Sequence, residues 1–156
     1  MIAVLQRADA ASVVVEGETV GEIGKGLLIL LGVAKEDTEE DAALLCKKIA
    51  ACRIFCDEQD KMNLSVLDIG GSALVVSNFT LLANYRHGNR PDYMRAAAPD
   101  RANALYEHFS ELLRREGVPV ANGVFGADMS VSLCGNGPVT VVMDSNELKK
   151  KKESVQ

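Results

Sequence analysis

The chain has 156 residues, of which 47% are hydrophobic and 25% are charged. This length fits one domain with a substantial core, and the composition is that of ordinary folded proteins rather than disordered or fibrous ones. The formal net charge of −5 argues against a broad phosphate-neutralising surface for gripping nucleic acid. A nucleic-acid ligand would therefore need a few concentrated contacts.

The chain shows neither a secretion signal nor a membrane span. Residues 1–7 lack the basic and apolar regions of a signal peptide. The most apolar stretch, residues 27–33, is far shorter than the ~20 residues that a membrane helix requires. We therefore expect a cytoplasmic protein that has no membrane partner.

The four cysteines, at positions 46, 52, 56 and 134, form no C-x-x-C pair and have no histidine placed to complete a zinc site. In a reducing cytosol they would remain thiols, and we expect them to serve as small packing residues. The sequence thus predicts neither a metal site nor a cofactor.

The first third of the chain alternates short apolar runs with turns. Strands are predicted over residues 2–7, 12–15, 19–23 and 27–33, the last of them apolar on both faces like a central strand. Acidic and N-capping residues at 37–41 then precede apolar residues at helical spacing. This pattern predicts a helix from about 38 to 52.

Later elements follow the same logic. Strands are predicted over 53–55, 61–67, 72–77, 128–134 and 138–144, and Gly135-Asn136-Gly137 is a hairpin-type turn signal between the last two. A second helix is predicted to begin near Pro99, and Gly117 stops it. Residues 83–98 show no periodicity, and such long irregular connections are often functional.

Strands outnumber helices and are grouped in hairpin-rich stretches, which favours an α+β fold. We expect β-sheets that form a barrel-like core, with two main α-helices packed outside. The single domain is predicted to cover residues 1–145. Residues 146–156 include Lys149 to Lys152 and lack a core-forming pattern, so they are predicted to be a disordered tail.

The common catalytic signatures are absent: there is no phosphate loop, no H-E-x-x-H and no G-x-S-x-G. Two polar segments remain at strand ends, residues 77–81 (Ser-Asn-Phe-Thr-Leu) and 136–140 (Asn-Gly-Pro-Val-Thr). Taken alone, Ser77 and Thr80 would simply cap a strand end. Residues 86–90 and Arg95 form one local basic candidate for tRNA contact, and a solvated loop is an equal alternative.

The two segments, with residues 125–129 (Phe-Gly-Ala-Asp-Met) between them and Gln6-Arg7 at the start, resemble the D-aminoacyl-tRNA deacylase family. The match runs in order from residue 1 to about 145. One departure is Asn78, where the family usually has glutamine.

The resemblance implies a homodimer that hydrolyses the ester bond at the 3′ acceptor end of D-aminoacyl-tRNA, and of mischarged glycyl-tRNA, in chiral proofreading. Each site would combine the serine/threonine segment of one subunit with a cis Gly137-Pro138 of the other, supported by Arg7. A cis turn can point carbonyl oxygens at the place where an L side chain would lie, whereas glycine has no side chain to exclude. The implied catalytic residues are Ser77, Phe79 and Thr80, and the implied substrate-binding residues are Asn78, Phe125, Met129, Gly137 and Pro138.

The aminoacyl ester is already activated, so positioning and oxyanion stabilisation can suffice for hydrolysis. Backbone N–H groups around Phe79 and Thr80 could stabilise the developing charge, and the 2′-hydroxyl of the terminal ribose could help to activate water. A competing mechanism makes Thr80 a nucleophile, although its segment contains no evident base.

Two other functions stay open. A related editing enzyme with a trans Gly137-Pro138 bond would accept L-alanine, and Asn78 keeps this alternative open. A non-catalytic, dimeric nucleic-acid-binding module could instead use Lys149 to Lys152 for electrostatic contact.

Overall fold

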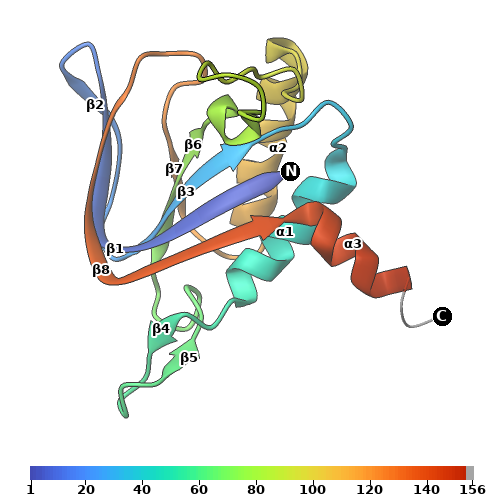
Figure 1. The fold of residues 1–156 in the computed structure, drawn as a ribbon. Helices are drawn as coiled ribbons and strands as arrows, with labels where there is room; N and C mark the ends of the chain where they lie inside the picture. Colours follow the sequence, from blue (N-terminus) through green and yellow to red (C-terminus); the bar gives the residue numbers. More distant parts are fainter. Residues whose placement is uncertain (154–156) are drawn as a thin grey trace.

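The computed structural model describes residues 1–153 of the chain. Figure 1 shows a strongly bent sheet with helices against one side. The elements, in chain order, are β1 (Ile2–Val15), β2 (Glu18–Ile23), β3 (Gly26–Gly32), α1 (Glu39–Ala51), β4 (Phe55–Cys56), β5 (Met62–Leu64), β6 (Ser72–Ser77), the 3₁₀ helix η1 (Phe79–Leu82), α2 (Pro99–Arg115), β7 (Val120–Asn122), β8 (Ser130–Asp144) and α3 (Ser145–Glu153).

The main sheet has the strand order β2-β1-β3-β6-β7, and β8 pairs with β1. The first half of β1 pairs with β3 and its second half with β2, while β8 runs antiparallel along nearly all of it. The β1–β8 register shifts on either side of Ala8, and bulges of this kind bend strands. Figure 1 shows both strands turning sharply, which makes the sheet nearly closed and barrel-like.

Helices α1 and α2 cover one face of the sheet and enclose the larger core. Thr38 and Asp41 form a capping box at the start of α1, and Pro99 occupies the first turn of α2, where its missing N–H costs nothing. The α2 residues that face the core recur at helical spacing and include Leu105, Phe109 and Leu113. A smaller core of buried side chains comprises Ala11, Val13, Ile23, Leu28, Leu74 and Val76.

The predicted α+β fold with a barrel-like core and two main helices is confirmed, as is the irregular course of residues 83–98 apart from short bridges. The cysteine prediction holds for Cys46, which is buried, and burial raises the pKa of its thiol to about 12. It is wrong for Cys56 and Cys134, which are exposed.

The predicted hairpin between 128–134 and 138–144 is wrong, because β8 is one continuous strand. Its neighbour β1 also continues without interruption, so it offers pairing partners on both sides of the glycines, and register shifts absorb the irregularity. The predicted separation of 2–7 from 12–15 fails for the same reason. The sequence did not predict β7, which is only three residues long and pairs in parallel with β6.

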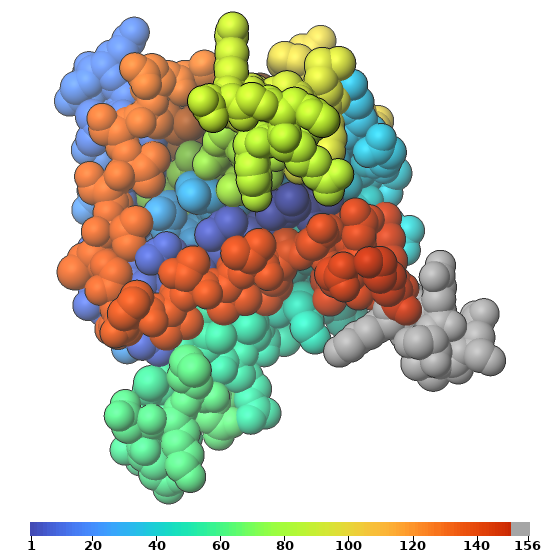
Figure 2. All heavy atoms as spheres, viewed as in Figure 1, coloured from blue at the N-terminus to red at the C-terminus, as the bar shows by residue number. Residues whose placement is uncertain are grey.

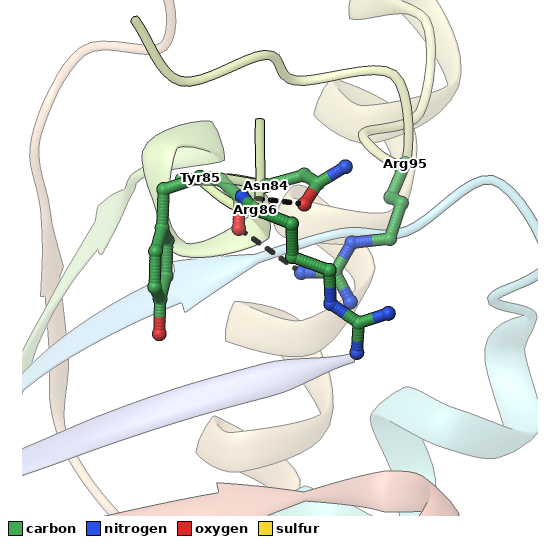
Figure 3. A pocket seen from close by; sticks show the side chains of 5 residues that line it. Asn84, Tyr85, Arg86 and Arg95 are labelled. Carbon is green, nitrogen blue, oxygen red and sulfur yellow. Dashed lines mark hydrogen bonds between the residues drawn. The ribbon is translucent and has the colours of Figure 1, made fainter. Parts of the chain in front are cut away.

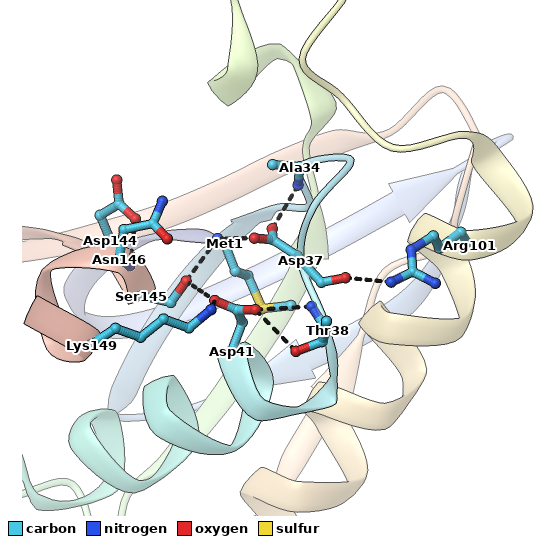
Figure 4. A network of polar contacts seen from close by, with 10 residues as sticks. All are labelled: Met1, Ala34, Asp37, Thr38, Asp41, Arg101, Asp144, Ser145, Asn146 and Lys149. Carbon is cyan, nitrogen blue, oxygen red and sulfur yellow. Dashed lines mark hydrogen bonds and ion pairs between the residues drawn. The ribbon is translucent and has the colours of Figure 1, made fainter. Parts of the chain in front are cut away.

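The prediction of a disordered tail is also wrong for the described residues, since α3 begins at Ser145. A polar cluster, here called the α1–α3 junction, anchors this helix and consists of Asp37, Asp41, Ser145 and Lys149 around the Met1 amino group (Figure 4). Asp41 accepts hydrogen bonds from Ser145 Oγ at 2.6 Å and Lys149 Nζ at 2.8 Å. Residues 154–156 of the predicted tail lie outside the described residues.

Candidate active site

The predicted catalytic segment follows the end of the central strand β6. Ser77 is the last residue of that strand, and Asn78 leads into η1. The Asn78 N–H donates to the Leu31 carbonyl at 2.8 Å, which ties the segment to β3. A Cβ atom at Gly32 would lie 2.6 Å from Leu82 Cδ2, 3.0 Å from Leu81 Cβ and 3.2 Å from the Asn78 carbonyl oxygen, so a larger residue there would force η1 to shift away from β3.

A cavity of about 520 Å³ opens beside this strand end, a volume within the range of small-molecule sites. Its polar side is formed by Ser77 and Asn78, and most of the remainder is apolar or aromatic. The lining residues are Val33, Ser77, Asn78, Phe79, Tyr93, Ala96, Ala97, Pro99, Ala102, Phe125, Gly126, Ala127 and Met129.

Thr80 is exposed and does not line this cavity. Its hydroxyl donates a hydrogen bond to Asn78 Oδ1. An amide oxygen cannot act as a strong base, so this contact orients the hydroxyl without activating it. Asn78 therefore connects the polar side of the cavity to Thr80.

The Phe79 ring is 56% exposed and forms part of the cavity wall. It packs edge-on against Tyr93, with the ring centroids 5.0 Å apart, a preferred geometry for aromatic pairs. Tyr93 belongs to the irregular stretch of residues 83–98, so this contact joins that stretch to the catalytic segment.

The opposite wall comes from the connection between β7 and β8, which contributes Phe125 and Met129. Phe125 packs on Tyr106 of α2 at a centroid distance of 6.0 Å. Burial raises the pKa of the Tyr106 phenol, and its hydroxyl donates to the Val75 carbonyl at 2.8 Å. Asn122 donates to the same hydroxyl at 3.0 Å, so helix, strand and cavity wall are held together.

The second predicted segment lies elsewhere on the chain. Gly137 and Pro138 are exposed on β8, and neither lines the 520 Å³ cavity. The Gly137–Pro138 peptide bond is cis, whereas the alternative editing enzyme requires a trans bond. Gly137 has a φ of +129°, and a Cβ atom there would lie 2.8 Å from Val139 N and 3.0 Å from Arg7 Nη2.

Arg7 lies against this segment from β1. Its Nε donates to the Asn136 carbonyl at 3.0 Å, and its Nη2 donates to Asn136 Oδ1 at 3.1 Å. The remaining nitrogen, Nη1, donates to the Ile54 carbonyl at 2.9 Å. The guanidinium thus fixes the residue before Gly137 and is only 9% exposed.

Of the nine predicted site residues, the structure brings five to one cavity: Ser77, Asn78, Phe79, Phe125 and Met129. It places Thr80 just outside and keeps Arg7, Gly137 and Pro138 together at a separate position. The sequence prediction omitted Tyr93, Ala96 and Ala97, because residues 83–98 carry no periodic pattern that would assign a wall of a cavity to them.

Among the side chains of residues 1–150, no group of three or more His, Cys, Asp or Glu is arranged to hold a metal ion. No helix in that part of the chain is both long enough and apolar enough to cross a membrane.

The chain is thus an α+β protein whose barrel-like core carries a ligand-sized cavity at the end of a central strand. The family described as D-Tyr-tRNA(Tyr) deacylase matches residues 4–144. The chain belongs to this family.

Relatives and solved structures agree with this assignment. The chain is 57% identical to a D-aminoacyl-tRNA deacylase of Chloroflexus aurantiacus over 149 residues, covering 96% of this chain and 93% of the relative. It is 56% identical to one of Thermus aquaticus over 147 residues, covering 94% and 97%. These relatives confirm the predicted family and an enzyme of this hydrolase class.

Two solved structures share the fold. One, titled c-Myc DNA unwinding element binding protein, has a TM-score of 0.86 at 39% identity and covers 92% of this chain and 98% of that one. The other, a probable eukaryotic D-amino acid tRNA deacylase, has a TM-score of 0.81 with the same coverage, and at 18% identity it supports the fold alone.

Proposed function

We propose that the chain hydrolyses the ester bond of D-aminoacyl-tRNA and of mischarged glycyl-tRNA in the cytoplasm, releasing free amino acid and tRNA. The observation that carries this proposal is the cavity of about 520 Å³ at the end of β6. Its apolar and aromatic walls suit the amino acid side chain and the terminal base, and Ser77 and Asn78 suit the polar ester end. The names of the relatives supply the substrate class.

Hydrolysis in this site relies on position rather than on a strong nucleophile. The N–H groups of Phe79 and Thr80 open the 3₁₀ turn, where a helical N–H has no partner within the helix, so they are available to a developing oxyanion. Because the Thr80 hydroxyl donates to an amide oxygen rather than to a base, it supports binding and orientation over covalent catalysis.

A homodimer would complete the site with the Gly137-Pro138 segment of the partner. Among the described strands, β8 pairs only with β1, so its outer edge is unpaired over 15 residues. Its exposed apolar side chains are Val131, Leu133 and Val142. Long apolar edges of this kind need to be covered, and a two-fold symmetric copy of the same chain would cover them.

Chiral selection would come from rejection by main-chain atoms. Arg7 holds the Asn136 carbonyl, so the segment that begins there is a fixed wall rather than a mobile loop. A fixed wall can exclude an L side chain, while a D side chain points elsewhere and glycine has nothing to exclude.

Subunit complementation tests this arrangement. Phe79→Ala removes part of the cavity wall, and Gly137→Ala places a Cβ atom too close to Val139 and Arg7. Each variant alone should lose most D-Tyr-tRNA hydrolysis. After unfolding and refolding an equal mixture, half the dimers are mixed and one of their two sites is intact, so about a quarter of the wild-type activity should return.

If each chain formed its own complete site, every site in the mixture would carry one defect and no activity would return. The same assay on wild-type protein should show hydrolysis of D-Tyr-tRNA and Gly-tRNA and none of L-Tyr-tRNA. Intact D-Tyr-tRNA at micromolar enzyme would overturn the proposed function.

A further inference from the structure

A second cavity lies next to the candidate active site, on the loop that runs from Asn84 to Arg95. Asn84 and Asp92 close this loop through paired backbone hydrogen bonds of 2.8 and 2.9 Å. The cavity measures about 350 Å³ and is lined by Ala83, Asn84, Tyr85, Arg86 and Arg95 (Figure 3). In Figure 2 the surrounding residues, in yellow-green, stand out from the face formed by β1 and β8.

The charge of this loop is opposite to that of the whole chain. It carries Arg86, Arg90 and Arg95 against one carboxylate, Asp92, in a chain of net charge −5. Within residues 1–150, whose side chains the structure describes, no ion pair neutralises any of these three guanidinium groups, since every ion pair found there involves other cations. Two like charges that line one small cavity repel each other, and a bound anion would relieve that repulsion.

The single carboxylate of the loop is already engaged. Asp92 Oδ2 accepts from Asn84 Nδ2 at 3.2 Å, and its Oδ1 accepts from the Met94 N–H at 3.1 Å. Arg95 donates to the Ala83 carbonyl at 3.3 Å, which directs its side chain into the cavity and leaves other N–H groups of the guanidinium available. The loop is therefore built to hold positive charge in place.

An exposed aromatic ring stands in the same cavity. Tyr85 is 78% exposed, the most exposed large hydrophobic side chain in the described part of the chain. Single-stranded nucleic acids are recognised by this combination, with bases stacked on aromatic rings and phosphates held by arginine. A simple inorganic anion would leave the tyrosine without a role.

The cavity also lies where the substrate of the proposed reaction must pass. Ala83 directly follows η1, and that 3₁₀ turn rises about 2 Å per residue, so the cavity begins about 8 Å from Phe79. From the other side, Tyr93 packs on Phe79, and Arg95 follows two residues later. The nucleotides that precede the esterified adenosine would reach this loop.

We infer that the cavity at Tyr85, Arg86 and Arg95 binds the single-stranded 3′ end of tRNA, holding a phosphodiester between the two arginines and stacking a base on the tyrosine. This assignment rests on the proposed function and adds a positively charged contact through which an acidic protein can bind RNA. The interaction is local, as the net charge requires.

Two substrates distinguish a role of this loop in tRNA binding from a role in ester hydrolysis. D-Tyr-tRNA contains the phosphates, whereas the D-tyrosyl ester of adenosine contains the scissile bond without them. Arg86→Gln and Arg95→Gln should each raise KM for the tRNA substrate about tenfold, the loss expected of one charged hydrogen-bonded contact, and leave kcat/KM for the adenosine ester unchanged. Each should also flatten the slope of log kcat/KM against log salt by about 0.7.

Matched variants define the specificity. Arg115→Gln removes the same charge at the far end of α2 and should alter neither substrate, because that side chain pairs with Glu111 on the helix surface. Tyr85→Leu should raise KM for the tRNA substrate about tenfold, and Tyr85→Phe, which keeps the ring, should not.

Equal losses on both substrates, or no loss on the tRNA, would overturn the inference. So would a change of oligomeric state in sedimentation, because the loop would then be a subunit interface. Fluorescence anisotropy with a labelled ACCA RNA oligonucleotide gives a readout without hydrolysis. If RNA binding depends on the arginines but the protein hydrolyses no ester, the proposed function is refuted and this binding site is retained. If the enzyme is active but its RNA binding does not depend on the arginines, the proposed function is retained and this binding site is refuted.

Discussion

The α1–α3 junction and the 84–95 loop both gather charged side chains, but they neutralise them in opposite ways. At the junction Asp41 is fully buried, and its oxygens accept from Thr38, Ser145 and Lys149. In the loop, Arg86 and Arg95 line an open cavity and have no carboxylate within 4.0 Å among the described residues. Charges paired inside the fold stabilise it, whereas charges left unpaired at the surface are available to a ligand.

The comparison predicts the largest loss of stability at Asp41. Replacing it with alanine removes the capping box of α1 and leaves Lys149 and Ser145 without their shared acceptor. Breaking a buried pair in this way should lower the free energy of unfolding by about 3 kcal/mol. Urea denaturation measures the effect, and a loss below that of an ordinary surface substitution would show that the junction does not anchor α3.

Acid should weaken the same junction. Burial by itself would raise the pKa of Asp41, but hydrogen bonds from Lys149, Ser145 and Thr38 outweigh it and lower the pKa from 3.8 to about 2. Because the folded-state pKa lies below the unfolded one, the stabilisation is complete above pH 4 and disappears as the pH falls towards 2. The loss is about 2 kcal/mol.

Thermal unfolding across this pH range, with Asp41→Asn as the control that cannot titrate there, checks this prediction. The stability difference between wild type and variant should shrink as the pH falls. A constant difference would assign the acid sensitivity to other carboxylates.

A smaller effect is expected at the exposed end of the junction. Lys149→Met keeps a side chain of similar length but removes the ammonium group, and because the Lys149 side chain is 37% exposed, the loss should be about 1 kcal/mol. Lys150→Met is the matched control, because the Lys150 side chain is 70% exposed and its one ion pair among the described side chains is with Glu147 of its own helix. Equal stabilities of the two variants would place the anchor of α3 elsewhere.

The sequence predicted best what depends on neighbouring residues. The helices at 39–51 and 99–115 carry their own capping and spacing signals, and the polar residues at the end of β6 follow an apolar run. Phe125 and Met129 were assigned through the family resemblance, and both line the cavity.

Long-range contacts explain what was missed. Lys149 to Lys152 suggested a solvated tail, because the sequence pattern does not reveal that Lys149 pairs with Asp41, more than a hundred residues earlier. The glycines of β8 suggested a turn, but pairing with the distant β1 keeps the strand continuous through them. Tyr93 lines the cavity and packs on Phe79, a contact that no local pattern in residues 83–98 predicts.

The smallest effect on stability is expected from substitutions in the 84–95 loop. Changing both Arg86 and Arg95 to glutamine removes two charges that form no ion pair, so the free energy of unfolding should change by less than about 0.5 kcal/mol. Relief of their mutual repulsion would make the change favourable rather than unfavourable. The same denaturation experiment that detects Asp41→Ala serves here, and a loss as large as that of the junction variant would mean that the arginines support the fold. An unchanged or slightly higher free energy of unfolding, together with weakened tRNA binding, is expected of residues that serve ligand binding rather than stability.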